Sequence, residues 1–199
     1  MILDRRQALI DTALTLFSRD GYHASGIDRI LAESGVAKMT LYKHFRSKED
    51  LIVAALQQCD ERFRAWIVAD VERRAKAPAR RLLAIFDTYG AWFEGGYDGS
   101  FTGCHFVKAA AEYADPSHPI HKTAADHKRA VLAYLGQLAR EANSRKPDAL
   151  ARRLFLLLEG ALSLASIDGD AESIHEAKRA ARTIVDAALL TRAGTKRAL

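Results

Sequence analysis

The chain has little cysteine, little proline and no long uninterrupted apolar run. Two cysteines among 199 residues are too few for a disulfide scaffold, so we expect a reducing cytoplasm. The N-terminal segment carries a charge every few residues and has no apolar h-region, which argues against a signal peptide. The most apolar stretch, residues 154–158, is flanked by Arg152, Arg153 and Glu159. It is too short to cross a bilayer, so no membrane partner is expected.

Strand patterns and catalytic motifs are also missing from the sequence. No segment of useful length alternates apolar and polar residues, and there is no Gly-rich phosphate loop, GxSxG turn or HExxH motif. Cys104 and His105 are the one pair that suggests a nucleophile with a base. Adjacent residues on a helix point about 100° apart and do not readily bond to each other. We therefore expect neither an enzyme nor a cofactor.

What the chain does contain is a surplus of helix formers and of positive charge. The composition is 49% hydrophobic and 28% charged, with a net charge of +5 and a pI near 9.3. This predicts an all-α fold long enough for a small and a larger domain, and it permits a nucleic-acid partner. Residues 1–50 hold eight Lys and Arg against seven Asp and Glu. Any argument for DNA binding therefore depends on where the charges lie.

The first fifty residues predict three helices and the start of a fourth. Asp4 with Gln7 gives a capping-box start and Gly21 a stop for the first helix. A second helix fits residues 27–34, with Ser25 near its N-cap and Gly35 at its end. A third fits 38–45, and a long fourth begins after Ser47. Two short helices around a glycine corner, preceded by a longer helix, predict a helix-turn-helix domain over residues 1–50.

The third helix presents a dense row of hydrogen-bond donors. Leu41 and Phe45, four residues apart, are expected to hold it on the first two helices. Its other face then carries Lys38, Thr40, Lys43 and His44, with Tyr42 at the flank. Lys and Thr side chains can read base edges in the major groove, while Tyr and Lys hold phosphates. An ordinary solvated helix face is the alternative, but helix lengths, corner and caps favour a DNA reader.

Residues 8–51 resemble the DNA-binding domain of TetR/AcrR-family regulators. The matching signals are the ALxLFxxxGY end of the first helix, the IxxIxxxxGV corner, and TLYxHFxSKxxL. The resemblance implies an all-helical homodimer bound to double-stranded operator DNA. It also implies that the larger domain, residues 51–199, binds a small-molecule effector and dimerises. Effector binding in this family usually releases the DNA.

The resemblance also implies roles for individual residues of the first domain. Base-facing or groove-facing positions are Lys38, Met39, Thr40, Lys43 and His44. Phosphate contacts fall to Tyr42 and Lys48, while Ser25 and Gly26 bring the second helix's N-terminus to the DNA backbone. Two positions depart from the family pattern. Ala37 replaces a frequent capping Ser, which removes a cap worth about 1 kcal/mol, and Met39 replaces a frequent Gly or Pro.

About half of the aromatic residues fall between positions 86 and 113. The resemblance places the effector cavity in this region, and aromatic walls suit an apolar or planar effector. Plain core is the alternative role for each aromatic side chain. The candidate effector-binding residues are Phe86, Tyr89, Trp92, Phe93, Cys104, His105, Phe106, Lys108 and Tyr113.

Two sharper hypotheses concern cysteine and histidine. Cys104, beside His105 and near Lys108, suggests a thiol that senses electrophiles or oxidants; a small buried hydrophobe is the alternative. A second group resembles a metal-ligand set but lacks regular spacing, so we expect loop and surface histidines and no metal. That group consists of His118, His121 and His127 with Asp115 or Asp126.

The last two helices, expected over residues 148–167 and 171–192, are apolar on more than one side. Paired with their symmetry mates they would form a four-helix dimer interface. Internal core is the alternative. The predicted interface residues are Leu154, Leu158, Ala161, Leu162, Ala181, Ile184, Val185 and Ala188.

The sequence as a whole predicts a cytoplasmic, ligand-responsive DNA-binding regulator. The favoured form is a repressor released from a palindromic operator by a small apolar or aromatic effector. A redox-sensing regulator acting through Cys104 is the alternative within this class. A competing class is a helical module that binds any DNA duplex through basic side chains. The salt dependence of binding to a defined operator would distinguish it from a sequence-specific regulator.

Overall fold

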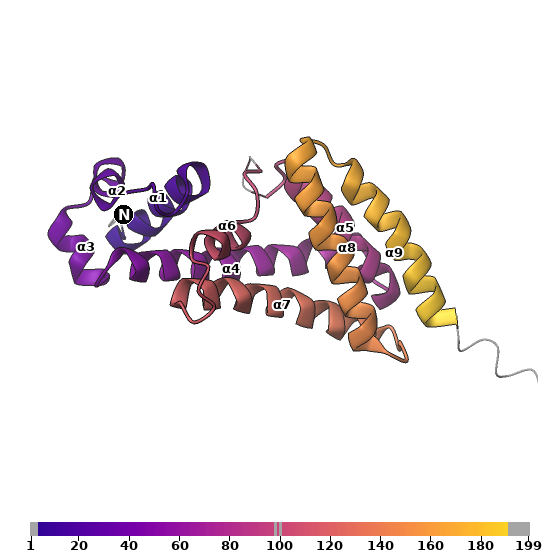
Figure 1. The fold of residues 1–199 in the computed structure, drawn as a ribbon. Helices are drawn as coiled ribbons and strands as arrows, with labels where there is room; N and C mark the ends of the chain where they lie inside the picture. The colour runs from indigo at the N-terminus through magenta and orange to yellow at the C-terminus, as the bar shows by residue number, and fades with distance from the viewer. Residues whose placement is uncertain (1–3, 98, 100, 191–199) are drawn as a thin grey trace, which may run out of the picture. The chain divides into compact units, whose positions relative to one another are not determined.

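The computed structural model describes residues 4–97, 99 and 101–190, and these residues form nine α-helices and no strand (Figure 1). The predicted all-α class is therefore confirmed. Positions 191 and 192, predicted as the end of the last helix, lie outside the described residues. The helices are α1 (Arg5–Asp20), α2 (Ile27–Ser34), α3 (Lys38–His44), α4 (Lys48–Arg74), α5 (Pro78–Phe93), α6 (His105–Glu112), α7 (Pro119–Glu141), α8 (Pro147–Asp168) and α9 (Glu172–Leu190).

The chain divides into two compact units. The first unit consists of residues 1–63 and 102–128, and the second of residues 64–101 and 129–199. The first unit therefore holds α6 and the start of α7 in addition to the helices predicted as the DNA reader. The second unit holds α5, α8 and α9, together with the later parts of α4 and α7.

Local signals set the ends of α1 and α2 as predicted. The Asp4 side chain accepts hydrogen bonds from the backbone N–H groups of Arg6 and Gln7, at 3.0 and 3.3 Å. Gly35 ends α2 in the left-handed region at φ 66°, where a side chain would be strained. The Gln7 amide does not complete a capping box, because it bonds to Asp11 and Gln58 instead. As expected, α3 starts at Ala37 without a side-chain cap.

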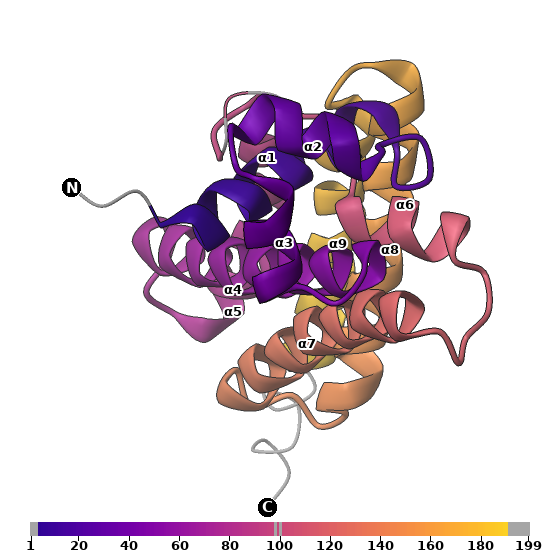
Figure 2. The ribbon, with the colours of Figure 1, turned by 90° about the vertical axis from the view of Figure 1, so that its left-hand side faces the viewer.

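The core of the first unit joins α1, α2 and α3. Figures 1 and 2 show these three helices gathered around one another, and each contacts the other two. α3 contributes Leu41 to this core, α2 contributes Ile30, and Phe45 follows α3; all three are buried. Full burial of one such side chain stabilises the fold by about 1.5–3 kcal/mol. Leu31, the neighbour of Ile30 on α2, is only half-buried.

One carboxylate ties α6 to the turn between α1 and α2. Glu112, the last residue of α6, accepts hydrogen bonds from the backbone N–H groups of Tyr22 and His23 at 2.8 and 2.7 Å. Its second oxygen also lies 2.9 Å from Nδ1 of His23. At Gly21, where φ is +92°, an added Cβ would lie 3.0 Å from Glu112 Oε1. The close approach and the backbone conformation both require glycine there.

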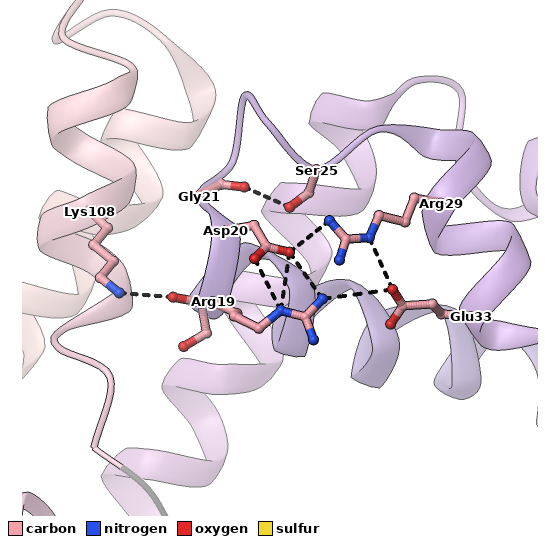
Figure 3. Close-up of polar contacts among 8 residues, drawn as sticks. Arg19, Asp20, Gly21, Ser25, Arg29, Glu33 and Lys108 are labelled. Atoms are coloured by element: carbon pink, nitrogen blue, oxygen red, sulfur yellow. Dashed lines mark hydrogen bonds and ion pairs between the residues drawn. The ribbon is translucent and has the colours of Figure 1, made fainter.

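Two further contacts fasten α6 to α1. The Tyr22 hydroxyl donates to the His105 carbonyl at 3.0 Å. Lys108 Nζ donates a hydrogen bond to the Ser18 carbonyl at 2.9 Å, near the C-terminal end of α1. Figure 3 shows Lys108 and this contact as a dashed line. Both ends of α6 are therefore attached to the helices predicted to read DNA.

In the second unit, α5, α8 and α9 pack against one another. The buried carboxylate of Asp70, on α4, accepts a hydrogen bond from the Thr88 hydroxyl of α5 at 2.8 Å. Lys178 of α9 pairs with Asp87 of α5 at 2.6 Å. These polar contacts fix α5 against α4 and α9, where most other contacts are apolar.

We predict that Glu112→Gln lowers the free energy of unfolding by about 1–2 kcal/mol near neutral pH. Burial alone would raise the pKa of Glu112, but hydrogen bonds from His23 and Tyr22 outweigh it and hold the pKa below its ordinary 4.5. A lowered pKa means that the ionised carboxylate stabilises the fold above pH 4.5, and that this contribution is lost as pH falls through the folded-state pKa. Urea unfolding across this pH range measures the difference.

Glu33→Gln is the matched control, because Glu33 is exposed and pairs only with exposed arginines. Its expected effect is below about 0.5 kcal/mol. A Glu112→Gln effect that stays constant down to about pH 3 would show that the carboxylate charge does not stabilise this contact.

Candidate DNA-binding surface and effector site

The predicted reading residues of α3 lie together on its outward face. Leu41 is fully buried, whereas Met39 is 85% and Tyr42 51% exposed. Lys43 and His44 are exposed as well, and Thr40 is half-buried. The buried side of α3 thus determines which side chains meet solvent, and those are the donors expected to face DNA.

Lys38 and Lys48 both have partners within the first unit. Lys38 Nζ lies 3.4 Å from Asp28 Oδ1 of α2, and both side chains are largely exposed. Such a pair is weak, so a phosphate can replace the carboxylate. Lys48 Nζ donates to the His23 carbonyl at 3.1 Å, and burial lowers the pKa of Lys48. Lys48 therefore links the start of α4 to the α1–α2 turn.

Ser25 and Gly26, predicted to act together, differ in their surroundings. Ser25 is fully buried, and its hydroxyl donates to the Gly21 carbonyl at 2.7 Å (Figure 3). It therefore fixes the turn that precedes α2 and does not point to solvent. Gly26 is the N-cap of α2, without a side-chain cap bond, and it is exposed. Of the two, Gly26 leaves the N-terminus of α2 open to an anion.

A charged network that the sequence analysis did not identify joins α1 to α2. Arg29 lies 2.9 Å from Asp20 and 3.0 Å from Glu33, and Arg19 pairs with Asp20 at 3.0 Å (Figure 3). All four side chains reach solvent, so each pair contributes little by itself. Together they orient α2 on α1. Only the Arg29–Glu33 spacing of four residues could have been found from the sequence.

Three of the four aromatic residues predicted for the effector site on α5 are core residues of the second unit, and the fourth, Phe93, is half-buried. Phe86, Tyr89 and Trp92 are 1%, 2% and 6% exposed. Tyr89 and Trp92 pack edge to face with ring centroids 5.7 Å apart, and Phe101 lies 5.0 Å from Trp92 and 4.9 Å from Phe93. These rings pack against one another in the edge-to-face and tilted arrangements that aromatic pairs favour.

The other predicted effector residues belong to the first unit, so the structure does not gather the nine candidates in one compact unit. Phe106 is buried and stacks on His127 with centroids 3.7 Å apart. Burial, followed by the charge of Lys108, lowers the pKa of His105 to about 4, so its ring is neutral at neutral pH. Tyr113 stacks between His23 and His118, at 4.7 and 4.8 Å.

The cysteine and histidine candidates have definite partners. Cys104 is half-buried at the N-cap of α6, and Lys128 Nζ of α7 lies 3.5 Å from its sulfur. His127 is 2% exposed, and its Nδ1 contacts Asp60 at 2.7 Å. His121 Nδ1 lies 2.8 Å from the Tyr113 carbonyl. In the described part of the chain, no three His, Cys, Asp or Glu side chains are placed to hold a metal ion.

The residues predicted for the dimer interface lie mostly on the inner sides of α8 and α9. Ile184 and Ala188 are half-buried. The other six have at most 5% of their surface exposed within one chain, and these are Leu154, Leu158, Ala161, Leu162, Ala181 and Val185. A side chain without exposed surface has none left to bury against a partner.

The exposed apolar side chains of α8 are different ones. Leu156, Leu164 and Ile167 are 71%, 53% and 77% exposed. Leu156 and Leu164 also line a shallow hollow of about 530 Å³ between the outer sides of α8 and α9. α8 therefore carries exposed apolar side chains in addition to the inward stripe that was chosen from the sequence.

A separate cavity of about 540 Å³ lies in the second unit between α4 and α7. It has aliphatic walls from both helices, with Arg64, Tyr134 and Arg140 among its polar lining residues. None of the candidates chosen from the sequence lines it. No helix within the described residues has the length and apolar character needed to span a membrane.

Known proteins match this chain over nearly all of its length. Residues 9–55 match the family model described as bacterial regulatory proteins, tetR family, and residues 78–181 match the tetracyclin repressor-like C-terminal domain. The regulator YjdC of Escherichia coli K12 is 24% identical over 181 residues, covering 91% of this chain and 93% of YjdC.

Solved structures agree in fold and coverage. SCO4454, a TetR-family transcriptional regulator from Streptomyces coelicolor, is 30% identical with a TM-score of 0.82, over 93% of this chain and 96% of that one. The reduced form of NemR from Escherichia coli is 25% identical with a TM-score of 0.80, over 90% and 96%. Two family domains in this order and a full-length structural match show that the chain belongs to the TetR family of transcriptional regulators, with a DNA-binding helix-turn-helix at its N-terminus.

Proposed function

We propose that this regulator is a cytoplasmic repressor that leaves a palindromic operator when a small effector binds. In this proposal residues 1–50 read DNA, and residues 51–199 bind the effector and a second protomer. The outward face of α3 carries the argument, since Leu41 is buried while Met39, Tyr42 and Lys43 are exposed. A helix fixed in this way presents donors to base edges and phosphates in a major groove. NemR, a similar protein over 92% of this chain, is named as a repressor.

A palindromic operator requires a two-fold symmetric protein. We assign the dimer contact to the exposed apolar face of α8, where Leu156, Leu164 and Ile167 have most of their surface available. This assignment replaces the inward residues predicted from the sequence. Each protomer would then present one α3 to one half-site.

We infer that α6 transmits the effector signal to the DNA reader. The segment before α6 joins it to the second unit at residues 101–102. Glu112 and Lys108 bind α6 to the α1–α2 turn and to the end of α1. Lys48, a proposed phosphate contact, bonds to the same turn through the His23 carbonyl. A displacement of α6 would therefore shift both the turn and the residues that hold phosphate.

We predict that selection from randomised duplexes at near-physiological salt recovers an inverted repeat. On that operator, Lys43→Ala should relax the preference at particular bases, costing about 1–3 kcal/mol of discrimination. Tyr42→Phe and Lys48→Ala should weaken binding equally on matched and mismatched duplexes, because phosphate contacts carry no sequence information. Equilibrium binding titrations at several salt concentrations measure these effects.

Val107→Ala is the matched control, since Val107 is 52% exposed on α6 and has no proposed DNA contact. If no motif is enriched and binding only fades as salt rises, the protein is a non-specific helical binder. If all three reading variants lose affinity alike on every duplex, the assigned division between base and phosphate contacts is wrong.

We predict that the double substitution Leu156→Glu with Leu164→Glu converts the dimer to a monomer. Two carboxylates on each copy of a symmetric apolar contact would be buried without partners, which costs several kcal/mol. Sedimentation velocity measures the oligomeric state, and circular dichroism checks folding. Val107→Glu, which places the same charge on another exposed apolar position, should leave the dimer intact. A folded double variant that stays dimeric would exclude this face.

One observation favours a second candidate function, a thiol-based sensor. Lys128 Nζ lies 3.5 Å from Cys104 Sγ and can donate a hydrogen bond to the sulfur. Cys104 is also the N-cap residue of α6, so a group added to its sulfur would lie at the start of the proposed transmitting helix. Cys59 is the natural comparison, because it is buried in the core of the same unit.

We predict that iodoacetamide, whose iodide the Cys104 thiolate displaces, releases the operator from the wild-type chain and from Cys59→Ser, but not from Cys104→Ser. Lys128→Met should slow alkylation of Cys104 by about tenfold or less, because it removes the ammonium group that lies 3.5 Å from the sulfur. Mass spectrometry gives the rate and a DNA-binding assay the release. Equal release from Cys104→Ser would exclude the sensor.

A further inference from the structure

The cavity between α4 and α7 has an apolar floor, and polar side chains are among its lining residues. Ile67 on α4 and Val131 on α7 are both 2% exposed and form the floor. Its volume of about 540 Å³ lies within the range of small-molecule sites, roughly 300–1,000 Å³. The lining residues of α7 run from Ala130 to Arg140, which corresponds to about 15 Å along the helix.

One polar group in this cavity lacks a partner. The Tyr134 hydroxyl oxygen is buried and makes no hydrogen bond within the protein. A buried polar atom without a partner costs about 1–3 kcal/mol, so its persistence needs an explanation. Burial is the main cause that raises the pKa of Tyr134 to about 12, so the hydroxyl keeps its proton. The hydroxyl is therefore a donor without an acceptor inside the protein, on a side chain that lines the cavity.

The charges around the cavity favour an anion. Arg64 and Arg140 line it, and no Asp or Glu does. Arg140 pairs with Asp148 at 3.0 Å, but both side chains are more than half exposed, so this contact is weak. Glu72 lies near the Tyr134 hydroxyl but outside the lining, 3.8 Å from Arg81.

The charge of the two units points in the same direction. Within the described residues, the second unit contains 15 Lys and Arg against 12 Asp and Glu, an excess of three. The first unit, which holds the helix-turn-helix, contains 12 of each. The positive excess of the described residues thus lies in the second unit, which holds the cavity, and it favours small anions there.

We propose that the cavity between α4 and α7 is the effector site, and that it takes an amphipathic organic anion. The ligand has an acyl or aryl body against Ile67 and Val131 and one carboxylate or similar acid. The acid accepts the hydrogen bond of the Tyr134 hydroxyl and is attracted by Arg64 and Arg140. This inference rests on the proposed effector-responsive function and names the effector's class. It moves the effector site from the α5 rings, which pack on one another, to this cavity.

The test uses decanoate and 2-naphthoate as probes, with 1-decanol and 2-naphthylmethanol as their uncharged counterparts. Isothermal titration calorimetry is performed on the full chain without DNA. At least one acid should bind, more tightly than its alcohol. Tyr134→Phe, which removes only the hydroxyl, should weaken binding of the acid by about three- to tenfold, the range for one lost hydrogen bond. Arg64→Gln and Arg140→Gln should each weaken binding of the acid more than binding of the alcohol.

Ala133→Trp fills the cavity from an exposed lining position and should abolish binding of both acids. Tyr97→Phe is the matched control, since Tyr97 lies in the same unit but does not line the cavity. The proposal is overturned if neither acid binds, if acid and alcohol bind alike, or if Ala133→Trp binds the acids unchanged. A DNA-release assay is run separately. Binding without release would contradict the proposed function and leave the site standing, whereas release from Ala133→Trp would contradict the site alone.

Discussion

The burial of Leu41 and Phe45 is the contact on which the DNA-reading surface depends. α3 has only seven residues and no side-chain cap at its start, and a helix of this length is not stable by itself in water. Its conformation therefore comes from packing on α1 and α2. Because the buried side is fixed, the exposed side is fixed as well. The same apolar contact thus holds the helix and selects the side chains that face solvent.

α6 packs on the helix-turn-helix and is attached to α1 and to the α1–α2 turn. Glu112 accepts two backbone hydrogen bonds and contacts the ring of His23, so one carboxylate satisfies three donors of the α1–α2 turn. Hydrogen bonds to a charged group are stronger than neutral ones. Gly21 favours this approach, since an added Cβ would lie only 3.0 Å from the carboxylate and the backbone there has φ +92°. The turn before α2 is therefore shaped jointly by α1 and by α6, a helix far away in the sequence.

Charge is distributed unequally between the two units. The unit with the helix-turn-helix is neutral overall, so a small number of placed side chains must carry DNA recognition. The other unit holds the positive excess and a cavity with two arginines and an unpaired hydroxyl. Recognition of particular bases depends on where individual side chains are placed. Attraction of a small anion depends on net positive charge and is helped by a buried hydrogen-bond donor.

The sequence by itself determined the all-helical class, the ends of the first helices and the outward face of α3. Those features depend on caps, glycines and spacings within one or two helical turns, which a linear reading contains. Tertiary structure decided the rest. Tyr22 and Glu112 bond across ninety positions, Ser25 is buried by the turn it supports, and the aromatic candidates divide between two units. α8 has two apolar sides, and only packing shows that Leu154 lies inside while Leu156 remains exposed. Periodicity reveals that a helix has an apolar stripe, but burial depends on which neighbours cover it.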